Sequence, residues 1–243
     1  MSRDYNDWII NQFGASARDL TPTSRRQAAQ VFYMPVSSDP EMTRVCSSIL
    51  SKIELQRADR FATQDHRTLF IQRRAFRRFC GARVPGASRP LSQVAFIETE
   101  NGRPYLCDLP DVWFSFSSCR FGFAAAWSST HGVGVDLADK TSKVKAAELA
   151  RQFFSAAEAR VVEVAGGLKR QNTFFQFWSL KEAALKSIGE GLPFGLDAFE
   201  FELEPDLRIV KVPTGYGGPE RFSAHMAEGT EACTALIIRD RVG

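Results

Sequence analysis

The chain lacks long hydrophobic runs. No run of about 18 apolar residues occurs, so the sequence predicts no membrane-spanning helix. The first ten residues, MSRDYNDWII, have neither the basic region nor the apolar core of a signal peptide. From these two absences we expect a soluble cytoplasmic protein with no membrane partner.

Cysteine and histidine are scarce. The five cysteines are odd in number and widely spaced, and none belongs to a CxxC motif. This pattern argues against a disulfide framework and against a structural zinc site. The three histidines form no pair at the spacing of metal ligands.

Neither sign of charge dominates. The sequence has 31 Lys and Arg against 28 Asp and Glu, a net charge of +3. That excess is too small to indicate nucleic-acid binding unless it is concentrated in one place. It is concentrated in the expected helix 64–80, where Arg73 and Arg77, and Arg74 and Arg78, form like-charged pairs four residues apart.

Such pairs need acidic groups nearby. The pattern is compatible with a solvated face that has local acidic partners, and equally with a phosphate-bearing ligand or an acidic protein. A nucleic-acid surface with Phe70 and Phe76 interleaved is a remote alternative, because aromatic residues at that spacing more often belong to a core.

The strongest helix signal covers Phe174 to Leu192, FFQFWSLKEAALKSIGEGL. Thr173 and Gln176 match a capping box at its start, and Gly189, Gly191 and Pro193 mark its end. The apolar stripe is wide and leaves one narrow polar strip. We expect this strip to carry Lys181, Glu182 and Lys186 close to Trp178, which is typical either of exposed ion pairs or of anion and metal chemistry.

Alternation and turn signals predict the remaining elements. Strands are expected at residues 31–36, 94–98, 112–118, 122–128, 132–137, 198–203, 207–212, 221–226 and 233–239, and helices at 41–61, 64–80, 143–153 and 155–164. Asn101-Gly102 predicts a two-residue hairpin turn, and Ser155 with Glu158 predicts a capping box. Strands and helices in this order indicate an α+β fold.

Asp136 ends an apolar strand, so a rigid element brings its carboxylate to a sheet edge. An Asp at this position is also typical of a turn or a helix N-cap.

Several segments together resemble the 4′-phosphopantetheinyl transferases of the Sfp type. In chain order they are Arg57 to Thr68, Gly102 to Leu106, Phe114 to Ser117, Gly134 to Asp136, Phe153 to Glu158, and Trp178 to Ala183 with Lys186. The resemblance covers about residues 31–239, and GVD followed by WxxKEAxxxK is its most specific part.

The resemblance implies two similar α+β halves related by a pseudo-twofold axis, with coenzyme A and Mg²⁺ in the cleft between them. We therefore expect an irregular N-terminal extension over residues 1–29, an N-terminal half over 30–130 on the coenzyme A side, and a C-terminal half over 131–243 with the metal and the catalytic helix. It also implies a monomer.

The implied reaction transfers 4′-phosphopantetheine from coenzyme A to a serine of an apo acyl, peptidyl or aryl carrier protein and releases adenosine 3′,5′-bisphosphate. Asp136 and Glu182 are then the magnesium ligands. Glu182, directly or through a water, helps to deprotonate the serine, Lys186 stabilises or protonates the leaving phosphate, and Lys181 supports the phosphate side. The positions implied for the coenzyme are Arg57, Thr68, Arg103, Ser117 and Ser118.

Two positions depart from the family pattern. Ser118 stands where the family commonly has a His, and Ala138 stands where many members have a second carboxylate after the Asp. Asp139 is expected to point to the other face of the strand and not to replace it. These departures favour a magnesium-demanding enzyme with two protein carboxylates, or alternatively a relative that binds coenzyme A or a carrier protein without turnover.

Overall fold

The computed structural model describes residues 18–19, 29–87 and 89–241. The extension predicted over residues 1–29 therefore lies almost wholly outside the described residues. Its described part includes Arg18–Asp19, which form the short strand β1 and pair antiparallel with the next strand. No helix among the described residues is both long and apolar enough to cross a bilayer.

The N-terminal part of the chain forms an antiparallel sheet in the order β1-β2-β6-β5, with helices on one face. Its elements are β2 (Gln30–Pro35), α2 (Pro40–Ser48), α3 (Lys52–Ala58), α4 (Gln64–Ala82), the 3₁₀ turn η2 (Leu91–Gln93), β3 (Ile97–Glu98), β4 (Pro104–Tyr105), β5 (Trp113–Cys119) and β6 (Gly122–Ser128).

The C-terminal part forms a three-stranded antiparallel sheet in the order β10-β11-β7. Its elements are β7 (His131–Asp139), α5 (Ala146–Phe153), α6 (Ala156–Val164), α7 (Gly167–Ile188), the 3₁₀ turns η3 (Leu192–Phe194) and η4 (Leu196–Ala198), β8 (Glu200–Glu202), β9 (Arg208–Lys211), the 3₁₀ turn η5 (Pro219–Arg221), β10 (Phe222–Glu228) and β11 (Ala232–Asp240).

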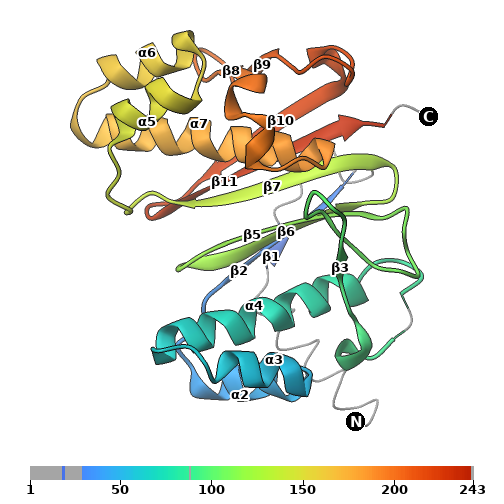
Figure 1. Cartoon of the computed structure of the whole chain (residues 1–243). Coiled ribbons are helices and arrows are strands. Elements are labelled where there is room, and N and C mark those ends of the chain that lie inside the picture. The colour runs from blue at the N-terminus through green and yellow to red at the C-terminus, as the bar shows by residue number, and fades with distance from the viewer. Residues whose placement is uncertain (1–17, 20–28, 88, 242–243) are drawn as a thin grey trace.

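The two parts repeat one order of elements. In the described residues from β2 to β6 and from β7 to β11, each part has a strand, three helices, a small two-stranded hairpin and a larger hairpin. In each part the last of these strands pairs with the first, as β6 pairs with β2 and β11 with β7. Figure 1 shows four layers, with the two sheets facing one another and the helices outside. The predicted α+β class is confirmed.

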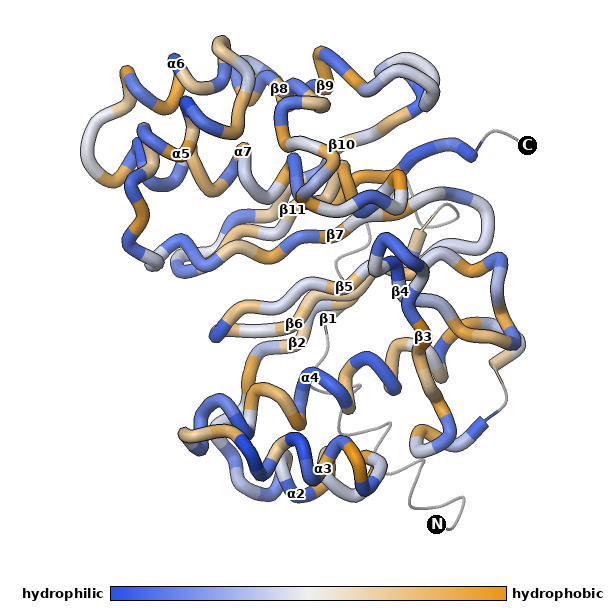
Figure 2. Tube along the Cα trace, viewed as in Figure 1, coloured by the Kyte–Doolittle hydropathy of each residue, from blue (hydrophilic) through white to orange (hydrophobic). Residues whose placement is uncertain are grey.

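Apolar side chains fill three regions of the fold. One cluster packs α4 on the first sheet, a second packs α7 on the other sheet, and a third joins the two sheets through residues such as Val31, Ala124 and Val135. Figure 2 shows hydrophilic and hydrophobic residues alternating along α4, as expected for a helix with one face on a core.

Two helix predictions need correction. The single helix predicted over residues 41–61 is wrong, because Ser51 caps a new helix through a capping box with Glu54 and so separates α2 from α3. The capping box predicted at Thr173 is also wrong. Gly166 is the N-cap of α7, so Thr173 lies buried inside the helix.

Other boundaries follow the sequence more closely. Helix α7 ends at Ile188, before the first of the three residues predicted to end it, because Gly189 takes the left-handed conformation at φ +81° that favours glycine. The strand predicted over residues 94–98 shrinks to Ile97–Glu98, and Gly102, at φ +82°, lies in a loop longer than the predicted two-residue turn.

The long helix α7 packs unusually close to β7. A Cβ atom built on Gly134 would lie 1.8 Å from the carbonyl oxygen of Ala183, and one on Gly132 would lie 2.5 Å from that of Ser187. Only the absence of side chains at these two positions lets the helix backbone approach the strand.

This contact predicts the effect of a single methyl group. We expect Gly134→Ala to destabilise the fold by about 3 kcal/mol or more, because the new Cβ meets main-chain atoms that have no room to move. Urea unfolding measures the change. Gly166→Ala is the matched control, since its Cβ would meet nothing within 4 Å and only the loss expected for Ala at an N-cap, about 1 kcal/mol, should remain. Equal stability of the two variants would contradict this packing.

Candidate active site

Strand β7 presents Asp136 towards α7. Side chains alternate along a strand, so Gly132, Gly134 and Asp136 share the face on which the helix lies. The neighbours Val133 and Val135 face the apolar layer between the two sheets. Asp136 is therefore buried, at 6% exposure, two residues from the closest approach of helix and strand.

Helix α7 brings Lys186 and Glu182 to the same place. The Lys186 Nζ atom donates to Asp136 Oδ1 at 2.7 Å and to the Val135 carbonyl oxygen at 3.2 Å. It lies 3.9 Å from Glu182 Oε2. The strand carboxylate and the helix carboxylate, 46 positions apart in the sequence, thus lie around one ammonium group.

Strand β5 supplies two serines to this cluster. The Ser117 hydroxyl donates to Asp136 Oδ1 at 2.8 Å, and the Ser115 hydroxyl accepts from the Val135 N–H at 2.9 Å. Both serines lie on one face of β5, and β5 and β7 are edge strands of their sheets. The free backbone groups of Val135 are thereby satisfied by side chains of Ser115 and Lys186.

Within the cluster, Glu182 has the fewest hydrogen-bond partners. Among the described residues it has an ion pair with Lys186 but no hydrogen-bond donor at close range. Burial raises the pKa of Glu182, the Lys186 charge lowers it, and the Asp136 charge raises it further. A half-buried carboxylate in this position has free oxygens for a cation or a proton.

The donor set suits a hard divalent ion. Asp136 and Glu182 offer carboxylate oxygens close together, and Mg²⁺ takes one or two carboxylates together with phosphate oxygens. Within the described ranges no group of three or more His, Cys, Asp or Glu residues is placed to hold a metal. A magnesium site here would therefore need oxygens from a ligand or from water.

The residues that follow Asp136 add no ligand. Ala138 is buried in the α7 core cluster. The Asp139 carboxylate accepts from Thr141 and Ser142 and lies 3.1 Å from Arg120 Nε, so its oxygens are engaged in the turn. Ser118, one residue after Ser117, lies on the other face of β5.

The expected phosphate role of Lys181 is wrong. Its side chain is fully buried on the opposite side of α7, where Nζ lies 2.6 Å from Glu158 Oε2 and donates to the carbonyl oxygens of Leu196 and Phe199. These contacts use all three donors of the ammonium group. Consecutive helix residues point about 100° apart, so Lys181 enters the core while Glu182 faces β7.

A cavity of about 280 Å³ opens beside the cluster. Glu182 and Lys186 line it from α7, and Arg103 lines it from the segment between β3 and β4. The Arg103 guanidinium lies 4.3 Å from the ring centre of Trp113. Burial lowers the pKa of Arg103, and the charge of Arg241 lowers it further. Arg77 of α4 also lines this cavity, and the sequence analysis did not assign it to the site.

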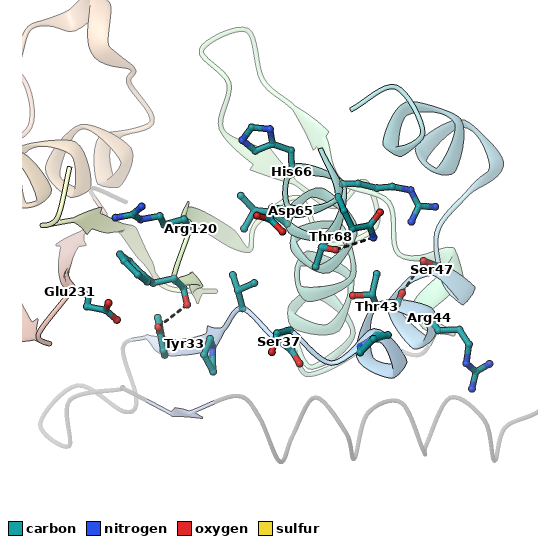
Figure 3. Close-up of a pocket in the computed structure, with 18 residues that line it drawn as sticks. Tyr33, Ser37, Thr43, Arg44, Ser47, Asp65, His66, Thr68, Arg120 and Glu231 are labelled. Atoms are coloured by element: carbon teal, nitrogen blue, oxygen red, sulfur yellow. Dashed lines mark hydrogen bonds between the residues drawn. The ribbon is translucent and has the colours of Figure 1, made fainter. Parts of the chain in front are cut away.

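Two expected coenzyme positions lie elsewhere. Thr68 lines a larger cavity of about 1130 Å³ and accepts a hydrogen bond from Gln64 at 3.4 Å. Figure 3 shows this cavity, with Thr68 on α4, Arg120 in the turn between β5 and β6, and Glu231 from the C-terminal part of the chain. Arg57 lies on α3 over the ring of Phe70. Neither residue lines the cavity beside Glu182.

Comparison with known proteins relates the chain to one group of transferases. A family profile described as the 4′-phosphopantetheinyl transferase superfamily matches residues 132–236, which include β7, α7 and β10. The chain is 30% identical over 126 residues to the 4′-phosphopantetheinyl transferase Sfp of Bacillus subtilis, covering 51% of this chain and 55% of the relative.

Two further relatives match a longer part of the chain. A putative 4′-phosphopantetheinyl transferase of Synechocystis sp., slr0495, is 31% identical over 168 residues, which are 68% of this chain and 65% of the relative. The 4′-phosphopantetheinyl transferase HetI of Nostoc sp. is 28% identical over 175 residues, which are 71% and 73% of the two chains. The matched part of this chain spans less than two thirds of the first two relatives.

The buried ion pair makes a prediction about Lys181. We expect Lys181→Met to lower the free energy of unfolding by about 3 to 5 kcal/mol, because it leaves the Glu158 charge buried without its partner. Adding Glu158→Gln to this variant should recover part of the loss. Guanidinium unfolding measures both. A single variant as stable as the unmodified protein would show that Lys181 does not have this structural role.

The raised pKa of Glu182 makes a prediction about pH. The folded state holds this proton more tightly than the unfolded chain, so the free energy of unfolding falls as pH rises from 4.5 through the raised pKa. Glu182→Gln removes this cost. We expect the variant to match the unmodified protein below pH 4.5 and to be the more stable of the two at neutral pH. Thermal unfolding across pH measures the difference, and a constant difference would contradict the shift.

Proposed function

Because the chain is a member of the 4′-phosphopantetheinyl transferase superfamily by its match over residues 132–236, we propose that it transfers 4′-phosphopantetheine from coenzyme A to a carrier protein. The acceptor is the serine hydroxyl of an apo acyl, peptidyl or aryl carrier protein. The serine oxygen bonds to the phosphorus that carries pantetheine, the bond within the diphosphate breaks, and adenosine 3′,5′-bisphosphate leaves.

One observation carries this proposal. Asp136 of β7 and Glu182 of α7 lie around the same Lys186 ammonium group, beside a cavity. Transfer of a phosphoryl group requires mainly positioning and neutralisation of oxygen charge. Asp136 and Glu182 would hold Mg²⁺, which when bound to the diphosphate supplies that neutralisation.

Lys186 is placed to act on the leaving phosphate. An ammonium group has three donors, and two of them point to Asp136 and to the Val135 carbonyl oxygen. Its 3.9 Å distance from Glu182 is too long for a hydrogen bond. The third donor thus remains for a phosphate oxygen, while Asp136 and Val135 fix the position of the side chain.

Glu182 is placed to act on the acceptor. Its pKa is raised by burial, which brings the carboxyl group closer to the range in which a general base works near neutral pH. The proton that leaves the serine hydroxyl passes to Glu182. Ser117 supports the cluster by its hydrogen bond to Asp136, and Arg103 lines the cavity beside the cluster, so both stay in the proposal as positions for the coenzyme.

We expect the enzyme to work as a monomer, because β5 and β7 of one chain contribute Ser117 and Asp136 to the same cluster. A cytoplasmic location remains part of the proposal. Arg57, Thr68 and Ser118 stay in the proposal as positions that the resemblance implies for the coenzyme. Nucleic acid is not among the proposed partners.

The proposal predicts the result of a transfer assay. With coenzyme A and Mg²⁺, the protein should add the mass of 4′-phosphopantetheine to an apo carrier protein. We expect Asp136→Asn to lower the rate by about 100-fold or more, because it removes one of two carboxylates and the partner of Lys186. Intact mass spectrometry of the carrier measures the rate.

Asp139→Asn is the matched control. Its carboxylate is engaged by Thr141, Ser142 and Arg120, so the variant should keep most of the rate. If the unmodified protein binds coenzyme A but never changes the carrier mass at high Mg²⁺, the chain is a binding relative without turnover. The absence of a third carboxylate near Asp136 among the described residues is the observation that favours that alternative.

A further inference from the structure

The N-terminal extension contains a sequence pattern that the proposed reaction does not use. Residues 1–17 precede the described part of the chain. Within them, aromatic and large aliphatic residues recur at Tyr5, Trp8, Ile9 and Phe13. Intervals of three and four residues would place these side chains on one face of a helix. Ile10 would lie on the other side of such a helix, so the pattern predicts a single apolar face.

The residues on either side of this pattern favour a short helix. Asp4 is a good N-cap residue, and Gly14 stands at the position after the last turn, where glycine is favoured. A helix of about ten residues is not stable alone in water. Its stability comes mainly from covering its apolar face. The pattern therefore indicates a segment that forms its helix on a surface.

Strand β1 brings this segment to one place on the fold. Arg18 lies opposite Tyr33 of β2, and Asp19 lies opposite Phe32. Because the pairing is antiparallel, the chain that precedes Arg18 leaves in the direction in which β2 runs, towards Pro35. Residues 14–17 can span at most about 14 Å. The segment with the apolar pattern therefore begins close to the end of β2.

Two cavities with apolar walls lie at this end of β2. The apolar and aromatic residues that line the cavity of about 1130 Å³ are Tyr33, Pro35, Val36, Pro40, Leu69 and Phe121. A second cavity of about 280 Å³ shares Pro35 and Val36 and adds Met34 and Met42. The Tyr33 hydroxyl donates to the Phe121 carbonyl oxygen at 3.3 Å, so β2 and the turn after β5 form one wall (Figure 3). This wall offers an apolar surface where the segment begins.

We propose that residues 4–13 bind as an amphipathic helix across these two cavities, with Trp8 and Ile9 against the wall that contains Val36. The occupant of this surface is thus the N-terminal segment of the same chain. The inference goes beyond the proposed reaction and does not depend on it. The described residues that line the two cavities include neither Asp136 nor Glu182.

Hydrogen–deuterium exchange of the full chain tests the docking. The Val36 N–H donates to the Phe121 carbonyl oxygen and the Ser37 N–H to Gln72 Oε1, so both amides exchange only when this region opens. Trp8→Ser removes the largest apolar side chain from the segment. We expect both amides to exchange about tenfold faster in this variant, because the cover over them is lost.

Ile10→Ser is the matched control. It also replaces a large apolar residue by serine, but on the other side of the expected helix, so it should change the two exchange rates by less than about twofold.

Limited proteolysis gives the reciprocal test, because chymotrypsin cleaves after accessible aromatic residues. Pro35→Asp places a charge in the wall and removes no backbone donor, since proline has no N–H. Cleavage within residues 4–13 should become about tenfold faster. Pro193→Asp, at an exposed proline of the C-terminal half, should leave it unchanged.

The inference is overturned if Trp8→Ser and Ile10→Ser change the exchange rates equally, or if Pro35→Asp leaves the cleavage rate unchanged. The two serine variants alter none of the described residues, so they give an answer even if Pro35→Asp does not fold. If the protection of Val36 and Ser37 increases with protein concentration, residues 4–13 bind a second copy of the chain. That result would also overturn the docking within one chain.

Discussion

The close contact between α7 and the glycines of β7 is the constraint on which the site depends. Gly132 and Gly134 let the helix backbone approach the strand, and Asp136 follows on the same face. At a wider helix-to-strand distance, the Lys186 side chain would have to extend further to reach both Asp136 and the Val135 carbonyl oxygen. The glycines therefore fix the spacing of the charged groups as well as the packing of the core.

A second constraint is the meeting of two sheet edges. Among the strands that the structure describes, β5 and β7 each lack a partner on one side, and serine side chains of β5 approach the backbone and carboxylate of β7. Edge strands usually need protection from unwanted pairing. Here the same polar atoms that protect the β7 edge also orient Asp136, so the site is built from groups that the fold must satisfy in any case.

The sequence predicted correctly those helix boundaries that depend on local interactions. The end of α7 at Gly189 and the capping box of Ser155 with Glu158 follow from the chemistry of one helix turn, and both are present. The start of α7 depends on burial against distant segments. So do the different positions of Lys181, which enters the core, and Glu182, which faces β7. The acidic partners of the α4 arginines, Glu54 and Glu98, come from other elements, and no periodicity in residues 64–80 identifies them.

The repeated order of elements has a consequence for ancestry. Each half is a complete strand–helices–hairpins unit, yet the cluster forms where the first strand of one unit meets a hairpin strand of the other. A chain of half this length could build the same junction only by associating with a second subunit. Fusion of two such units after gene duplication would give a single chain with two equivalent junctions, of which only one needs carboxylates. The chain would then keep a symmetric topology while only one junction keeps the reactive groups.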